Sequence, residues 1–248
     1  MASARYTLNI KPEDIQPDAP QRELTPKEKR ENFWFYYKWH VIGGAIACAV
    51  VFSMIWEIVS QVKPDYTIGI LSSNVVPVGI GEVLGERLAP YFDDRNGDGK
   101  VVVRVMEYTV AHGEALNSAD PNVQIANTTK LMGDLDAGES MLFLMDDLEY
   151  FEEQYFLLAY NDGSVPEEGV RPDYSRMGVR WGDCHTLTAL DLGSAEDFAG
   201  VPGVDYQDFL QDFQLVQRFI DGTKLENNKD AAAYHAASVE KFEELIQQ

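Results

Sequence analysis

The stretch Val41–Trp56, which reads VIGGAIACAVVFSMIW, contains no charged residue. Trp39 and His40 before it and Glu57-Ile58-Val59 after it extend the apolar segment to about 20 residues, the length with which an α-helix crosses the core of a bilayer. The sequence therefore predicts a single membrane-spanning helix near the N-terminus, and the lipid bilayer is the first expected partner.

The residues that flank this stretch predict its boundaries and its orientation. Thr25 and Glu28 have the spacing of a capping box, so the helix is predicted from Pro26 to about Ser60, and Pro64 ends it. Because cytoplasmic flanks carry an excess of Lys and Arg, the N-terminus is predicted to face the cytoplasm and the rest of the chain the outside of the plasma membrane. The basic residues close to the segment are Lys27, Lys29, Arg30 and Lys38 before it and Lys63 after it, and the aromatic residues typical of membrane interfaces are Phe33, Trp34, Phe35, Tyr36, Tyr37, Trp39 and Trp56.

Three other interpretations of the apolar stretch remain open. The least favoured is a buried helix of a soluble protein, because of the aromatic flanks and the charge asymmetry. A cleaved signal peptide needs a shorter apolar core and small residues at its exit, whereas this core ends in Met54-Ile55-Trp56. A lipoprotein anchor would use Cys48, but Ala45-Ile46-Ala47 is a poor lipobox and a long apolar run follows the cysteine.

Charge and cysteine content narrow the class of protein. The formal net charge is −21, from 20 Lys and Arg against 41 Asp and Glu, which argues against nucleic acid as a partner. Cys48 lies in the apolar stretch and Cys184 far beyond it, so no internal disulfide is expected. This pattern fits a Gram-positive cell surface better than a disulfide-rich eukaryotic ectodomain. We expect a disordered cytoplasmic tail over residues 1–25, a juxtamembrane and transmembrane helix over 26–60, and an extracytoplasmic α/β domain over 61–248.

Within the outer domain, short apolar β-rich runs alternate with segments of helical periodicity. This alternation predicts a βαβαβ unit with a parallel sheet, because parallel strands are joined by helical crossovers. Farther on, residues 156–160 could form a strand, and two amphipathic helices are expected to pack on the sheet. The predicted strands are Tyr66–Leu71, Val101–Val110 and Met141–Met145, and the predicted helices are Ile80–Tyr91, Val123–Leu135, Asp205–Ile220 and Ala231–Ile246.

The segment Asp93–Lys100 contains the pattern D-x-N-x-D-G, in which alternate oxygen-bearing side chains can wrap one cation. Asp94, Asn96 and Asp98, with the Lys100 carbonyl, are therefore candidate ligands of a structural calcium ion. The segment is not an EF-hand, because Val105 stands where a bidentate Glu belongs. The alternative is a polar turn, since Asn-Gly and Asp-Gly are strong turn dipeptides.

Polar residues follow the first and third predicted strands. Ser72 and Ser73 come after one, and Asp146 and Asp147 after the other. Ligands of open α/β sheets bind beyond the carboxyl ends of the strands, so these four are the candidate ligand-binding residues. His185, beside Cys184, is a weaker candidate for a metal or catalytic role.

Two passages resemble known proteins. The stretch 31–40, ENFWFYYKWH, resembles the N-terminus of uncharacterised single-pass membrane proteins of Gram-positive anaerobes. The stretch 128–139, TTKLMGDLDAGE, leading into MLFLM, is similar to the helix-Gly-strand passage of extracellular solute-binding proteins. The resemblance implies the first βαβαβ lobe of a periplasmic-binding-protein-like fold over residues 66–147. Little of the chain is left after residue 147 for a full second lobe.

Three functions compete at this point. The first is a membrane-anchored, non-catalytic binding or interaction module, whose partners would include other membrane proteins or a small molecule. The second is an accessory subunit of a membrane transporter or secretion complex. The third is a surface hydrolase that uses Asp146, Asp147 or His185. No catalytic motif appears in the sequence, which favours the first two.

Overall fold

The computed structural model describes residues 25–60, 63–167, 169–200 and 203–247. These residues fall into two parts, the long helix α1 and an α/β domain that follows it. Apart from Thr25, the predicted disordered tail lies outside the described residues.

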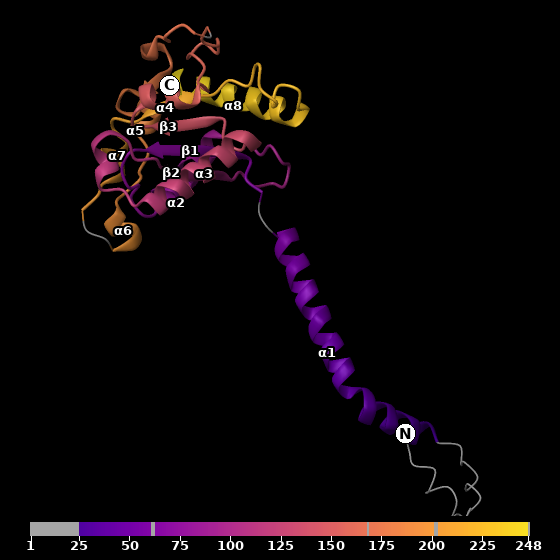
Figure 1. The fold of residues 1–248 in the computed structure, drawn as a ribbon. Coiled ribbons are helices and arrows are strands. Elements are labelled where there is room, and N and C mark those ends of the chain that lie inside the picture. Colours follow the sequence, from indigo (N-terminus) through magenta and orange to yellow (C-terminus); the bar gives the residue numbers. More distant parts are fainter. Residues whose placement is uncertain (1–24, 61–62, 168, 201–202, 248) are drawn as a thin grey trace, which may run out of the picture. The chain divides into compact units, whose positions relative to one another are not determined.

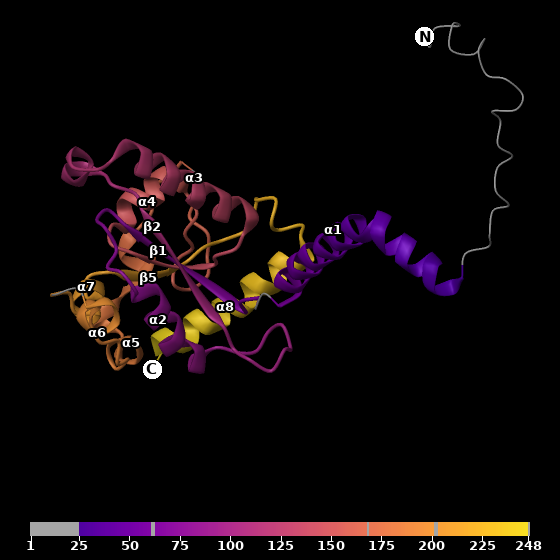
Figure 2. The ribbon, with the colours of Figure 1, turned by 90° about the horizontal axis from the view of Figure 1, so that it is seen from below.

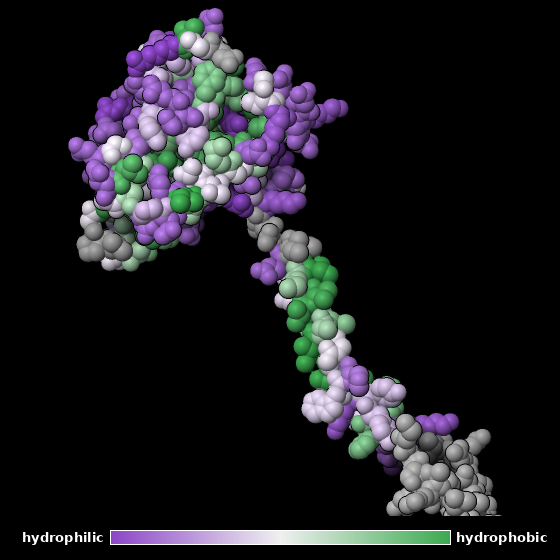
Figure 3. Space-filling model, viewed as in Figure 1, coloured by the Kyte–Doolittle hydropathy of each residue, from purple (hydrophilic) through white to green (hydrophobic). Residues whose placement is uncertain are grey.

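Helix α1 spans Pro26–Ser60 and begins at the predicted capping box. The Glu28 amide donates to Thr25 Oγ1 at 3.4 Å, and the Thr25 amide donates to Glu28 Oε2 at 2.8 Å. By length and composition, the segment Pro26–Glu57 is the one helix of the described chain that could cross a membrane, and its most apolar window is not buried by other protein atoms. Figure 3 shows the hydrophobic surface of this helix between more hydrophilic ends. The predicted N-terminal apolar helix is thus present.

In the described residues, five strands form one mixed sheet with the order β2-β1-β3-β5-β4. Strands β1, β2 and β3 are labelled in Figure 1. Strand β1 pairs in parallel with β2 and β3, whereas β5 is antiparallel to both β3 and β4. An α/β domain is confirmed, but its sheet is mixed and not purely parallel. The strands are β1 Tyr66–Ser72, β2 Val103–Thr109, β3 Leu142–Met145, β4 Gly178–Arg180 and β5 Gln214–Gln217; the helices are α2 Ile80–Leu88, α3 Pro121–Ala137, α4 Leu148–Tyr155, α5 His185–Thr188, α6 Ala195–Ala199, α7 Tyr206–Leu210 and α8 Lys229–Gln247.

Helices cover both faces of the sheet (Figure 2). On one face, Ile68 and Ile70 of β1 belong to a core cluster with residues of α2, α8 and the segment around Trp181. On the other face, Leu71 and Phe143 pack with residues of α3 and α4. The alternation of side chains along β1 thus serves two cores, which explains why all seven of its residues are buried.

The predicted helix over Asp205–Ile220 is wrong. Helix α7 ends at Leu210, and Gln214–Gln217 form strand β5 instead. The physical reason is tertiary: β5 pairs with all four residues of the buried strand β3, which would otherwise expose its backbone groups on that side. The possible strand over residues 156–160 is reduced to one isolated bridge, between Leu158 and Arg218.

The C-terminal helix α8 also completes the sheet. Strand β3 begins opposite Ile68, so it does not reach the start of β1. There the hydroxyl of Tyr234 takes its place, accepting a hydrogen bond from the Thr67 amide at 2.8 Å. Burial raises the pKa of the Tyr234 hydroxyl to about 12, so it stays protonated and able to bond in both directions.

Candidate functional site

The carboxyl ends of β1 and β3 form the point at which the chain changes sides of the sheet. After β1 it enters α2, whose buried residues belong to one core, and after β3 it enters α4, whose buried residues belong to the other. Loops that diverge in this way leave a crevice between two neighbouring strands, and such switch points bind ligands in open α/β sheets. The four predicted ligand-binding residues lie here.

Three of these four residues are joined directly. Oδ2 of Asp146 accepts hydrogen bonds from Ser72 Oγ at 2.9 Å, the Ser73 amide at 2.7 Å and Ser73 Oγ at 2.7 Å. This carboxylate therefore holds the loop after β1 against the end of β3. Oδ1 of Asp146 is buried and accepts no hydrogen bond from the described residues.

The fourth residue, Asp147, points to a different group. Its Oδ1 caps α4 by accepting from the Tyr150 amide at 3.0 Å, and its Oδ2 lies 3.0 Å from Nε2 of His112. The His112 ring stacks on Tyr150 with ring centroids 3.8 Å apart, and its Nδ1 lies 3.1 Å from the Val110 carbonyl oxygen. Both ring nitrogens of His112 are thus engaged, and neither contacts a serine.

His112 was missed by sequence reasoning, although a signal existed. It follows β2 closely, just as Ser72 and Asp146 follow β1 and β3, so the rule that selected those residues applies to it as well.

A hollow of about 250 Å³ opens at the same edge of the sheet, between the loop after β1 and the start of α3. Ser73 borders it and also donates a hydrogen bond to Asp146, so the hollow lies next to the switch point. Gln124 lies in its wall, fixed by bonds to both backbone groups of Ala111. The carboxylate of Asp120, which caps α3, gives the wall a negative charge. The remaining lining residues are Asn74, Val75, Thr109, Ala111, Ala115, Ser118, Ala119 and Val123.

The D-x-N-x-D-G loop folds around its own carboxylates. Asp94 accepts from the amides of Gly97 and Gly99 at 2.6 and 2.7 Å, and Asp98 accepts from the Lys100 amide at 2.9 Å. Asp65 accepts from the Asn96 amide at 2.9 Å and so attaches the loop to the start of β1. Among the described residues, no group of three or more His, Cys, Asp and Glu is placed to hold a metal ion. The calcium hypothesis stays a prediction, and the geometry gives the loop a turn structure of its own.

The weaker candidate His185 and two buried titratable groups, Cys184 and Glu152, have separate surroundings. Cys184 is buried and its thiol donates to the Leu245 carbonyl at 3.1 Å, whereas His185 is exposed at the start of α5. Glu152 is buried, and its Oε2 accepts from the Leu157 and Leu158 amides at 3.0 and 2.9 Å. Burial raises the pKa of Glu152 above its ordinary value of 4.5, and the two amide bonds oppose the rise.

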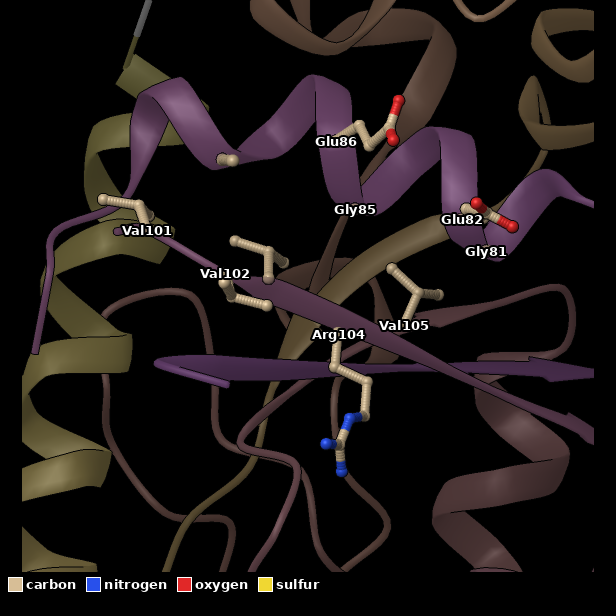
Figure 4. A pocket seen from close by; sticks show the side chains of 10 residues that line it. Gly81, Glu82, Gly85, Glu86, Val101, Val102, Arg104 and Val105 are labelled. Carbon is tan, nitrogen blue, oxygen red and sulfur yellow. The ribbon is translucent and has the colours of Figure 1, made fainter. Parts of the chain in front are cut away.

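A second concave surface lies along strand β2, the edge of the sheet (Figure 4). We call it the edge groove. It encloses about 580 Å³ between α2 and β2, and its lining residues are Gly81, Glu82, Gly85, Glu86, Ala89 and Val101–Val105. Sequence reasoning missed this groove, although the spacing of Gly81, Gly85 and Ala89 at every fourth position indicated a bare helix stripe.

No protein-family model, curated protein or solved structure matches the chain.

Proposed function

We propose that the chain is a membrane-anchored, non-catalytic binding module. Helix α1 is the anchor, with its N-terminus in the cytoplasm, and the α/β domain binds a small ligand outside the cell at the crevice between β1 and β3. The parallel strands β2, β1 and β3, connected through α2 and α3, support the βαβαβ lobe that the resemblance to solute-binding proteins implies.

One observation carries the binding role. Asp146 lies at the switch point, and its Oδ1 is a buried acceptor without a donor among the described residues. An unsatisfied buried acceptor costs about 1–3 kcal/mol or more when charged, so a ligand that donates a hydrogen bond here would gain that energy. The carboxylates of Asp147, the next residue along the chain, and of Asp120, in the wall of the hollow, favour a donor that carries positive charge, and they disfavour anions. The ligand class is therefore a small amine.

The arrangement around His112 argues against the hydrolase alternative. A general base needs a ring nitrogen within reach of a nucleophile, but Nε2 faces Asp147 and Nδ1 faces a backbone oxygen. The His112 ring is instead held in place by stacking on Tyr150.

The test is a thermal-shift titration of the full chain in nanodiscs with a panel of small primary amines and a matched panel of carboxylates. We expect at least one amine, and no carboxylate, to raise the melting temperature of the domain. The variant Asp146→Asn should lose this response. The control Asp173→Asn changes a carboxylate that caps a short turn elsewhere, through the Ser175 amide at 3.2 Å, and should keep it. Stabilisation by carboxylates, or an equal amine response in Asp146→Asn, would contradict the proposal.

A further inference from the structure

Strand β2 leaves one side of its backbone without a neighbouring strand in the described chain. Its seven residues make it the longer edge of the sheet, since the opposite edge strand β4 has three. The Val102 carbonyl accepts a hydrogen bond from the amide of Asp65, which immediately precedes β1. The Val110 amide donates a hydrogen bond to the Ser72 carbonyl of β1. The backbone N–H and C=O groups of the even-numbered residues of β2 therefore face β1. Those of Val103, Val105 and Glu107 face outward.

Two contacts confirm this outward direction. The Glu107 carbonyl accepts from Lys130 Nζ at 3.3 Å, outside the ladder with β1. The Val103 carbonyl oxygen lies against α2, so close that a Cβ added to Gly85 would be 2.4 Å from it. Val103 and Val105 both line the edge groove.

Helix α2 presents a bare stripe of glycines to the strand, and Gly81 and Gly85 both line the groove. Gly81 and Gly85 contribute no side chain, and the Gly81 amide donates to Glu107 Oε1 at 3.1 Å. Beside this stripe, Glu82 and Glu86 are exposed on α2 and project at the rim of the groove (Figure 4). Arg104 points away from α2, toward the other face of the sheet (Figure 4).

We propose that the edge groove binds an extended segment of a partner protein, which adds to β2 as a sixth strand and carries basic side chains at alternate positions. The spacing supports this partner. Glu82 and Glu86 are one helical turn apart, a rise of about 6 Å. Side chains on one face of a strand repeat every two residues, at about 6.7 Å. Alternate Lys or Arg side chains on the α2 side can thus meet both carboxylates, while the side chains between them face Arg104 and are expected to be uncharged or acidic.

Charge also decides between this partner and a second copy of the chain. Pairing of two β2 strands would bring the Glu82 and Glu86 pairs of both copies into one groove, and each copy carries a net charge of −21. A cationic strand is instead attracted electrostatically, because the chain is acidic. Backbone hydrogen bonds along the edge would supply affinity, and the two glutamates would select the partner, as in other cases of strand addition.

The experiment uses the full chain in nanodiscs of neutral lipid and a fluorescent nine-residue peptide in which Lys and Thr alternate. Binding is followed by fluorescence anisotropy, and amide hydrogen exchange locates it. We expect saturable binding that weakens with salt and that slows exchange at Val103 and Val105. The variant Glu82→Gln with Glu86→Gln should bind about three- to tenfold more weakly. The matched control Glu196→Gln with Glu243→Gln removes the same charge from two exposed positions of α6 and α8 and should bind like the unaltered chain.

Two peptide controls separate strand addition from plain charge attraction. N-methylation of the alternate amides that face β2 should abolish binding, whereas methylation of the other amides should preserve it. Substitution of Glu for every Lys should also abolish it. Equal binding of both methylated peptides, or protection from exchange outside β2 and α2, would overturn the proposal. A dimer that forms without peptide would also overturn it, if light scattering detects the dimer and the amides of Val103 and Val105 are protected from exchange in it. Such a dimer would assign the groove to a second copy.

Discussion

Replacement of Gly85 by alanine tests how closely α2 approaches the edge strand. A Cβ at this position would lie 2.4 Å from the Val103 carbonyl oxygen, a backbone atom that cannot rotate away. Helix α2 would have to move outward by about 1 Å, and such overpacking costs about 1–3 kcal/mol. Alanine also gains about 1 kcal/mol over glycine in a helix interior, so the net loss should be about 0–2 kcal/mol.

Gly133 of α3 is the matched control, because a Cβ there would meet nothing within 4 Å. Gly133→Ala should stabilise the domain by about 0.5–1 kcal/mol through helix propensity alone. The propensity gain is common to both variants, so their difference isolates the overpacking cost of about 1–3 kcal/mol. Urea unfolding of the full chain, read by pulse proteolysis of the α/β domain, measures both values. Equal stabilities for the two variants would refute the close approach of α2 to β2.

Protease added to intact cells should digest the chain after Lys63 and spare the residues before α1; digestion of the N-terminal side alone would reverse the proposed orientation. Mass spectrometry without reduction should find Cys48 and Cys184 as free thiols, with Cys184 reacting with maleimide only after unfolding, since it is buried. Burial raises the pKa of Glu152 in the folded state, so its contribution to stability is fully present below the unfolded-state pKa and is lost as pH rises through the folded-state pKa. In urea titrations at several pH values, Glu152→Gln should therefore flatten the decline of stability just above pH 4.5. The calcium hypothesis predicts a melting temperature that rises with calcium over chelator in the unaltered chain and not in Asp98→Ala; an unchanged value in both would leave the loop as a self-bonded turn.

The order of the first strands and helices could be predicted because each carries its own local pattern. Strand β3 is a continuous apolar run and α3 has Pro121 at its start and Gly138 after its end, so both are recognisable without tertiary information. The position of Ser72 and Asp146 followed from the same order, since polar residues after parallel strands gather at one edge.

Strand β5 could not be predicted, because its apolar residues continue the spacing of α7. Tyr206, Leu210 and Phe213 fit a helical face that Val216 extends, and only the unpaired side of β3 favours a strand over Gln214–Gln217. A short apolar run of this kind suits helix and strand alike. The edge groove could not be predicted for a related reason. Strand β2 is an edge only because β3 pairs on the other side of β1, and no single segment of the sequence predicts the order of the strands.

The hydrogen bond between Tyr234 and Thr67 has a consequence for folding during synthesis. The two residues are 167 positions apart, so the ribosome must finish nearly the whole domain before the start of β1 gains its last partner. Phe242 and Leu245 of the same helix, both buried, reach the core last as well. The core of a nascent chain is thus incomplete for almost the whole of its synthesis. A premature stop within α8 should therefore leave a fragment that cannot complete its core and is open to degradation.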